Sequence, residues 1–441
     1  MARLNPGELE IDLFCKGLRI DPSCRLDRDA RLFSRTRAGL GSGLELIIPG
    51  DLKDIWMNAP VEEDFCALSP YFLRWEEGRG YHVVDTRSDE AYDVTIPPQP
   101  AWYERTTSSG VPMSRVGVLQ GTYLGIYVSE ACMFWTPQEN ANCKFCTSGV
   151  NVGVNEVTRK RVRDVVEVAR AAKEESGVTF VHFNAGYQWE DLPEHTRAHG
   201  LNRAAPFVKA IREEVGLFTG VQVAPVLPRD HWKYDWLVEL GADHFSFCYE
   251  FHNPEYFERF CPGKKRHLGQ EAFFAALEYT SKLLGKGKVS GEIIAGLEPI
   301  EDTFRAIDYI TSVGAFPTVC IFRPLIGADL EHYPSPPYED MRRVFEHVWH
   351  AMVRNGIPME IVPNIEVSLV VQPGDAAYLV ERDLRWRAYR AKNAVLRLLA
   401  RPLVRWKLKP HPVRASATDH PNLPPRLPVA EGAERRDGEA A

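Results

Sequence analysis

From Gly121 onward, short runs of β-branched and aromatic residues alternate with longer stretches that have helical periodicity. This alternation is typical of repeated βα units, in which each strand of a parallel sheet is followed by a crossover helix. The expected strands are Tyr123 to Val128, Thr179 to Asn184, Phe218 to Ala224, His244 to Tyr249, Val289 to Ala295, Pro317 to Phe322 and Met359 to Val362. The expected helices are Arg161 to Glu175, Ala204 to Glu214, Gln270 to Leu284, Glu301 to Val313 and Tyr338 to Asn355, each ending near a glycine or asparagine. We therefore expect an α/β fold, a partial (β/α)6-type TIM-like barrel.

Two segments are expected before residue 366. Residues 1–115 mix short apolar runs with turn formers, which predicts an α/β N-terminal extension. Residues 116–365 hold the repeated βα units and form the core barrel.

Two further segments are expected after the barrel. Residues 366–410 contain an Arg-rich amphipathic stretch, for which a closing helix with a solvated basic face is favoured over a membrane-binding or partner-binding helix. Residues 411–441 are rich in Pro, Ala, Arg and Glu, with few large apolar residues to offset the entropy of ordering. This predicts a disordered tail.

The net charge and the lengths of the apolar runs limit the binding partners that the sequence predicts. The net charge of -7 gives no global reason to bind nucleic acid. The N-terminus lacks the basic and apolar regions of a signal peptide, and no apolar run reaches the ~20 residues that span a bilayer. We expect a cytoplasmic protein with a small-molecule substrate, no nucleic acid and no membrane.

Three cysteines form the strongest chemical signal. Cys132 follows the first barrel strand, and Cys143 and Cys146 follow after a ten-residue interval. Thiolates suit soft iron and zinc, and the C-x-x-C pair allows two sulfurs to reach one metal site. Three ligands leave one position open, whereas structural zinc normally has four protein ligands.

The alternative interpretation is a zinc site or a set of buried thiols. A zinc site needs a fourth ligand from a distant part of the chain. The candidates are Cys66, Cys248, Cys261 and His182.

Together, the strand, the three-cysteine loop, the aromatic Phe145 before the last cysteine and the successive βα units resemble the radical S-adenosylmethionine (SAM) superfamily. The resemblance covers roughly residues 117–362 and is closest to the biotin-synthase-like branch. With the N-terminal module, it is also similar to uncharacterised radical SAM proteins of nitrilase gene clusters. The usual family spacing is C-x3-C-x2-C, so the ten-residue gap is a departure shared with minority branches.

The resemblance implies a 4Fe-4S cluster on Cys132, Cys143 and Cys146, with SAM bound at the open iron. It implies that reductive cleavage of SAM starts radical chemistry on the substrate, and that an electron donor such as flavodoxin or ferredoxin is needed. Cys248 and Cys320 are treated as core residues.

The resemblance also implies contacts to SAM. Asn184, Ala185 and Gly186 stand where the family places a turn that binds the methionyl amine, although the family's acidic residue is missing here. Phe145 would lie beside adenine. Glu250 stands where the family often keeps a polar residue for the ribose or amine.

Four further positions are expected to contact SAM or line its site, each with a structural alternative. Arg266 would pair with the SAM carboxylate, or lie in a solvated basic turn. Ile293 and Gly296 belong to the segment expected against adenine, or to plain core. Arg323 ends a strand, where barrel enzymes place site groups, or forms a structural ion pair.

Three other functions stay open. One is transfer of an aminocarboxypropyl or methyl group from SAM. The second is a non-catalytic binding protein stabilised by zinc or an iron-sulfur cluster. The third is a TIM-like hydrolase with Glu250, His182 or Glu298 as acid and base, which leaves the cysteine loop unexplained.

Overall fold

The computed structural model describes residues 3–24, 43–189 and 200–423. Its largest unit is a seven-stranded sheet in the order β13-β12-β11-β10-β9-β8-β7. The strands are β7 (Val118–Gln120), β8 (Tyr123–Tyr127), β9 (Phe180–Asn184), β10 (Phe218–Gln222), β11 (His244–Glu250), β12 (Val289–Ala295) and β13 (Phe316–Ile321). From β8 to β13 each strand pairs in parallel with the next along the chain, and β7 pairs antiparallel with β8. Parallel neighbours in chain order produce a curled half-barrel whose edges are β7 and β13.

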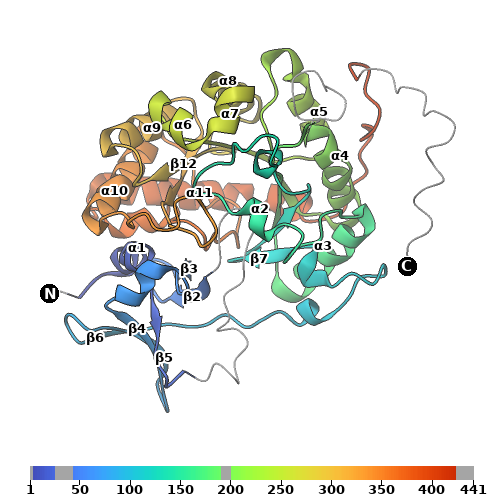
Figure 1. Ribbon diagram of the computed structural model, residues 1–441. Coiled ribbons are helices and arrows are strands. Elements are labelled where there is room, and N and C mark those ends of the chain that lie inside the picture. The colour runs from blue at the N-terminus through green and yellow to red at the C-terminus, as the bar shows by residue number, and fades with distance from the viewer. Residues whose placement is uncertain (1–2, 25–42, 190–199, 424–441) are drawn as a thin grey trace.

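Helices cover the outer face of this sheet (Figure 1). They are α3 (Val162–Ser176), α4 (Gly200–Ala210), α5 (Trp232–Leu240), α8 (Gln270–Leu284), α9 (Ile300–Ser312) and α10 (Tyr338–Asn355). The shorter α2 (Ser148–Asn151) follows the cysteine loop, and α6 (Pro254–Phe260) and α7 (Pro262–His267) hydrogen-bond to that loop. Side chains of a strand alternate between faces, so Phe183 of β9 packs outward on Phe207 of α4. His182, one residue earlier, points inward to His244 of β11.

Six of the expected strands are confirmed, and the strand from Met359 to Val362 is wrong. Glu360 has φ of 55°, a left-handed conformation that interrupts extended backbone. The expected helices are also present, with bounds that differ by a few residues. Helix α5 was not expected, because its aromatic residues do not form a clear helical stripe.

The N-terminal part contains α1 (Pro6–Lys16), the hairpin β2 (Leu44–Ile48) and β3 (Ile55–Ala59), and a second sheet. That sheet has the order β1-β4-β5-β6, with β1 (Arg19–Ile20), β4 (Tyr71–Glu76), β5 (Gly80–Asp85) and β6 (Glu90–Asp93). Asn5 and Glu8 form a capping box at the start of α1, where Pro6 supplies a fitting φ. The part therefore has both helix and strands, beside the barrel (Figure 1).

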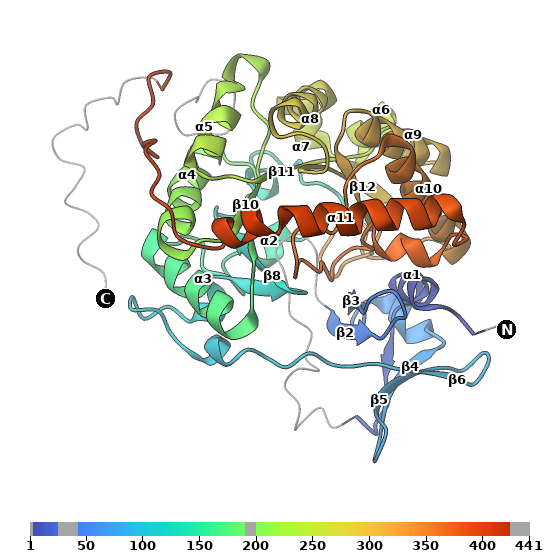
Figure 2. The same cartoon turned by 180° about the vertical axis from the view of Figure 1, so that it is seen from behind.

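The last long helix, α11 (Leu384–Lys407), crosses the back of the molecule (Figure 2). The Asp383 side chain caps it by accepting a 2.8 Å hydrogen bond from the Trp386 N–H. No helix in the described ranges has the length and apolar character required to cross a membrane.

The chain after α11 packs against α4 and α5. Trp236 Nε1 donates to the Ser416 carbonyl at 2.8 Å, and Lys209 Nζ donates to the Ala415 carbonyl at 2.8 Å. The expected disorder from residue 411 is thus not confirmed for residues 411–423, and residues 424–441 lie outside the described part of the chain.

Candidate metal centre

The three loop cysteines lie together beyond the end of β8. Burial, followed by the neighbouring Cys143 and Cys146, raises the pKa of the Cys132 thiol to about 12. The pKa of Cys146 is raised by burial and by Cys143. Three thiols close enough to perturb one another form one site.

No three His, Cys, Asp or Glu side chains among the described residues converge on a point where a single ion would fit. A four-iron cluster does not require such convergence, because each cysteine binds a different iron. The three thiols therefore fit a cluster, in which they need not converge on one ion.

The loop of Cys132 is fixed against the chain that follows β9. Met133 N–H donates to the Tyr187 carbonyl at 2.7 Å, and Gly186 N–H donates to Ser129 Oγ at 3.1 Å. A Cβ on Gly186 would lie 2.8 Å from Cys132 Cβ and 2.3 Å from the Tyr127 hydroxyl. Glycine therefore permits a contact that any side chain would prevent.

The C-x-x-C segment is fixed by backbone hydrogen bonds on both sides. Lys144 N–H donates to the Phe260 carbonyl at 2.9 Å, and the Lys144 carbonyl accepts from Leu330 N–H at 3.0 Å. The Phe145 ring meets the Phe251 ring edge to face, with centroids 5.9 Å apart. The cysteine loop is thereby bound to both α6 and the chain after β13.

A buried ion pair lies beside Cys143. Lys264 Nζ is 2.6 Å from Glu250 Oε1 and donates to the Cys248 carbonyl at 2.7 Å. A hydrogen bond from the Cys261 thiol lowers the pKa of Cys143 despite burial, and the Lys264 charge lowers it further. The surroundings of Cys143 thus favour a thiolate, the form that binds iron.

Glu250 itself adopts a left-handed φ of 69° where the β11–β12 register shifts. This strained position ends β11 and directs the Glu250 carboxylate to Lys264. The sequence indicated Glu250, but among the adjacent cations of α7 it favoured Arg266 over Lys264, because the buried cation cannot be identified from the chain alone.

Asn184 and Tyr187 supply unpartnered polar atoms near the cysteines. Asn184 Oδ1 and the Tyr187 hydroxyl are buried, without a hydrogen-bond partner. Burial raises the pKa of Tyr187, and the Cys143 and Cys132 thiols are among the groups that perturb it. Buried polar groups usually have partners. These two atoms therefore fit a bound polar group such as SAM.

Two of the further expected residues are engaged in ion pairs. Arg266 NH1 is 2.8 Å from Glu139 Oε2 and is more than half exposed. Arg323 forms a nearly buried ion pair with Glu63, a residue of the N-terminal part. Arg323 therefore forms the structural ion pair that was the alternative to a SAM contact. Arg266 lies at the rim of the cysteine loop.

Of the two expected residues around β12, one is directed away from the inner face and the other is a glycine packed closely against its neighbours. Ile293 shares its strand face with Gly291, where a Cβ would meet Ile310 of α9 at 2.8 Å. Gly296 has φ of 101°, and a Cβ there would lie 2.5 Å from Pro336. The side chain of Ile293 therefore faces the helices.

The inner face carries polar residues that sequence reasoning missed. Glu292 Oε2 accepts from the Cys248 thiol at 2.8 Å, and Glu292 Oε1 accepts from the Ser246 hydroxyl at 2.8 Å. Gln222 Nε2 donates to Cys248 Sγ at 2.8 Å. Burial raises the pKa of Glu292. The alternation of polar and apolar residues in β11 could have indicated that one face of the sheet is polar.

No protein-family model matches the chain. A curated relative, the bacteriochlorophyllide c C-7(1)-hydroxylase of Chlorobaculum limnaeum, is 24% identical over 272 residues, 58% of this chain. The match spans 64% of that relative, somewhat less than two thirds of its length.

Solved structures with similar chains include methylornithine synthase, at a TM-score of 0.39 and 16% identity over 62% of this chain and 81% of that one. A second is a radical SAM methyltransferase from Sphaerobacter thermophilus, at a TM-score of 0.37 and 14% identity over 66% of this chain and 76% of that one. The chain is similar to radical SAM enzymes. The fold described above rests on the strand order alone.

Proposed function

We propose that this chain is a radical SAM enzyme in which Cys132, Cys143 and Cys146 hold a 4Fe-4S cluster. The observation that supports the proposal is the grouping of these thiols beside a buried lysine, Lys264, at the carboxyl end of a parallel half-barrel. When bound, the cluster supplies an electron that cleaves a carbon–sulfur bond of SAM and starts radical chemistry on a substrate.

Asn184 and the backbone of Ala185 and Gly186 would hold the SAM amine. Asn184 Oδ1 is a buried acceptor without a partner, and an ammonium group is a donor that would satisfy it. Glu250 is already paired with Lys264, so its role would be to fix that lysine near Cys143. Phe145 and Arg266 stay predictions as SAM contacts.

Residues of the inner face would receive the substrate. Glu292 and Cys248 remain partly accessible although they lie at the centre of the sheet. A protonated Glu292 can donate a hydrogen bond and an ionised one can accept, so a polar substrate group would bind here. The hydroxylase name of the relative suggests oxidation of a carbon, but substrate and reaction stay open, group transfer from SAM included.

The second candidate is a zinc-stabilised binding protein. It is favoured by Cys261, whose thiol hydrogen-bonds to Cys143 and could provide a fourth ligand. The two candidates differ in what they require of Cys261, because a cluster with an open iron uses only three cysteines.

The test is metal content and the electron paramagnetic resonance spectrum of protein purified and reconstituted without oxygen. We expect about four irons per chain and a reduced signal that changes when SAM is added. Cys143→Ala should abolish the signal, whereas Cys261→Ala should retain it.

The same samples should be assayed for products of SAM cleavage. One zinc per chain, lost in both Cys143→Ala and Cys261→Ala, would establish the binding protein instead. A cluster that is indifferent to SAM would contradict the enzyme.

A further inference from the structure

Helix α11 exposes an apolar stripe to solvent. Its large apolar residues with exposed side chains are Leu384, Val395, Leu398, Leu399, Leu403 and Trp406. At 3.6 residues per turn these positions fall within about 140° of the helix circumference. The opposite side holds the buried residues Tyr389, Asn393 and Val404. The helix thus closes the fold as expected, yet the centre of its outward face is apolar.

Cations flank this stripe. The helix contains eight Lys and Arg and no Asp or Glu, in a chain whose net charge is -7. Arg390 and Arg397 pair with Glu360 on the protein side. Arg401 and Arg405 are exposed, and no ion pair is found for either within the described part of the chain.

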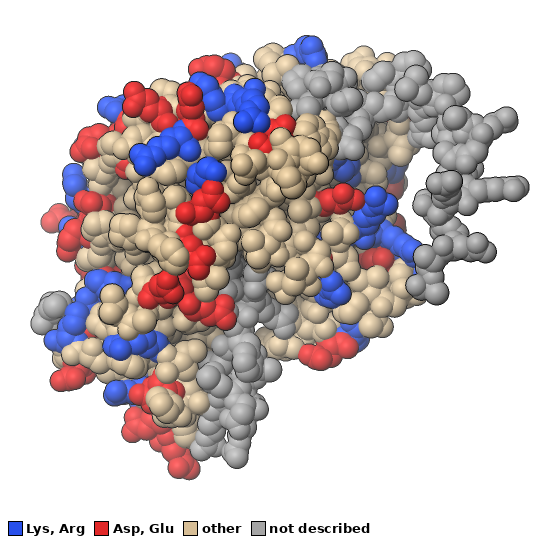
Figure 3. Space-filling view, in the orientation of Figure 1, with Lys and Arg blue, Asp and Glu red and all other residues tan. Residues whose placement is uncertain are grey.

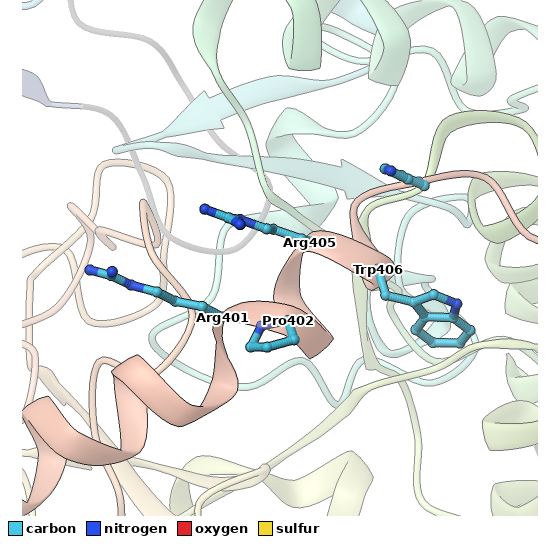
Figure 4. Close-up of a pocket in the computed structure, with 5 residues that line it drawn as sticks. Arg401, Pro402, Arg405 and Trp406 are labelled. Atoms are coloured by element: carbon cyan, nitrogen blue, oxygen red, sulfur yellow. The ribbon is translucent and has the colours of Figure 1, made fainter.

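The last turns of α11 border a surface depression of about 490 Å³ (Figure 4). It is lined by Arg401, Pro402, Arg405, Trp406 and Lys409. The two arginine side chains extend in the same direction, and the indole of Trp406 lies on the other side (Figure 4). One depression thus presents two guanidinium groups together with apolar ring surface, and this combination suits a phosphate ester that carries apolar chains.

The opposite face of the molecule differs. There, Lys and Arg are interspersed with Asp and Glu (Figure 3). Helix α11 itself contains cations and no acid, so the exposed Arg401 and Arg405 have no acidic neighbour on their own helix.

We propose that α11 docks the protein on an anionic phospholipid surface, with the helix parallel to the membrane plane. Interfacial helices have this composition: an apolar stripe with Leu and Trp, and Lys and Arg along its borders. From Leu384 to Trp406 the stripe is about 33 Å long at ~1.5 Å per residue. This proposal does not depend on the enzymatic one.

Two other occupants fit less well. A second copy of the chain would bring eight cations against eight in a symmetric contact, with no acid on either helix. An acidic electron-transfer protein would satisfy the cations but would leave a row of exposed leucines against a polar surface.

The experiment is sedimentation of the full chain with vesicles of phosphatidylcholine, with or without phosphatidylglycerol. We expect binding only when phosphatidylglycerol is present, and less binding at high salt. Each cation near an anionic surface contributes roughly a factor of five. Arg401→Glu/Arg405→Glu should therefore lower the partition coefficient at least about 20-fold.

A matched control is Arg74→Glu/Arg79→Glu, which changes the net charge equally on the N-terminal sheet. For the apolar stripe, Leu399→Glu/Leu403→Glu should abolish binding, while Leu68→Glu, at a leucine that is 88% exposed elsewhere, should not. Circular dichroism of each variant checks that the chain is folded.

Failure to bind phosphatidylglycerol vesicles, or equal loss of binding in the control variants, would overturn the proposal. So would a dimer in sedimentation velocity that only Leu399→Glu/Leu403→Glu dissociates, because the stripe would then cover a second copy. Iron content and SAM cleavage measured on the same variants should be unchanged, which separates this proposal from the enzymatic one.

Discussion

The inner face of the half-barrel and the outward face of α11 are unusual in opposite ways. The first holds polar residues inside the protein, and the second exposes apolar residues to solvent. Inside the sheet, Glu292, Ser246 and Cys248 place polar groups where aliphatic side chains would pack. On α11, Leu399 and Leu403 expose apolar side chains where polar ones would be neutral. Each arrangement has a cost: polar groups lose hydration inside the sheet, and apolar surface is hydrated on α11.

The two regions differ in the contacts that hold their side chains in place. The inner polar groups are hydrogen-bonded to one another, so their positions are fixed before any ligand arrives. The α11 stripe has no such support, and only its buried side determines its orientation. Substitutions on the inner face should therefore change stability, whereas substitutions on the stripe should change binding alone.

The largest effect is expected at Lys264. Lys264→Met would leave Glu250 buried without its cation, since the two side chains are 7% and 11% exposed. Breaking a buried pair costs roughly 3 to 5 kcal/mol of unfolding free energy. Urea denaturation of the metal-free protein measures this loss.

The double variant Lys264→Met/Glu250→Gln is the matched control. Removing both charges should recover a large part of the loss, because the unpaired carboxylate is its main cause. If the double variant is as unstable as Lys264→Met, the loss of unfolding free energy comes from the packing of the Lys264 side chain. The ion pair with Glu250 would then not be what stabilises this site.

A smaller effect, dependent on pH, is expected at Glu298. Burial raises the pKa of Glu298 to about 7, although its carboxylate accepts from the backbone N–H groups of Asn253 and His252. Because the folded pKa lies above the unfolded one, the stabilising contribution is complete below the unfolded pKa and is lost as pH rises through 7. The expected loss is roughly 2 to 3 kcal/mol between about pH 5 and pH 8.

Glu298→Gln stays neutral, so it should lack this part of the pH dependence. The measurement is the difference in unfolding free energy between the two proteins across that range, where Glu298→Gln should gain relative stability as pH rises. A constant difference would show that Glu298 titrates normally.

Gly186→Ala should cost about 1 to 3 kcal/mol, because a Cβ would overlap Cys132 and Tyr127. It should also lower the iron bound on reconstitution, since the cysteine loop has to move. The control is Gly269→Ala, which has open space but φ of 73°. Gly269→Ala should lose stability through backbone strain and retain its iron. Equal iron loss in both variants would show that the contact of Gly186 with the cysteine loop is not needed for iron binding.

The sequence predicts those features of the fold and of the candidate site that depend on neighbouring residues. The βα alternation predicts β8 to β13, and the spacing of the loop predicts that its three cysteines form one metal site. Both predictions depend only on neighbours along the chain. The Arg323–Glu63 pair joins residues 260 positions apart, and no local pattern indicates it.

Two other features depended on which side of an element faces inward. In β12 the run Glu292-Ile293-Ile294 contains adjacent apolar residues, so alternation could not assign Ile293 to the helix side. In α11 the amphipathic pattern was evident, but the buried contacts of Tyr389 and Val404 decide that the leucines face solvent.

The smallest effect on stability is expected on α11 and compares its two sides. Leu399 is 70% exposed, so Leu399→Ser should change the unfolding free energy by less than about 0.5 kcal/mol. Val404 is buried on the same helix, and Val404→Ser should cost about 1 to 3 kcal/mol through lost burial and an unpaired hydroxyl. Urea denaturation measures both. If Leu399→Ser destabilised the protein as much as Val404→Ser, the stripe would be covered by the chain itself and would not be free to bind a lipid surface.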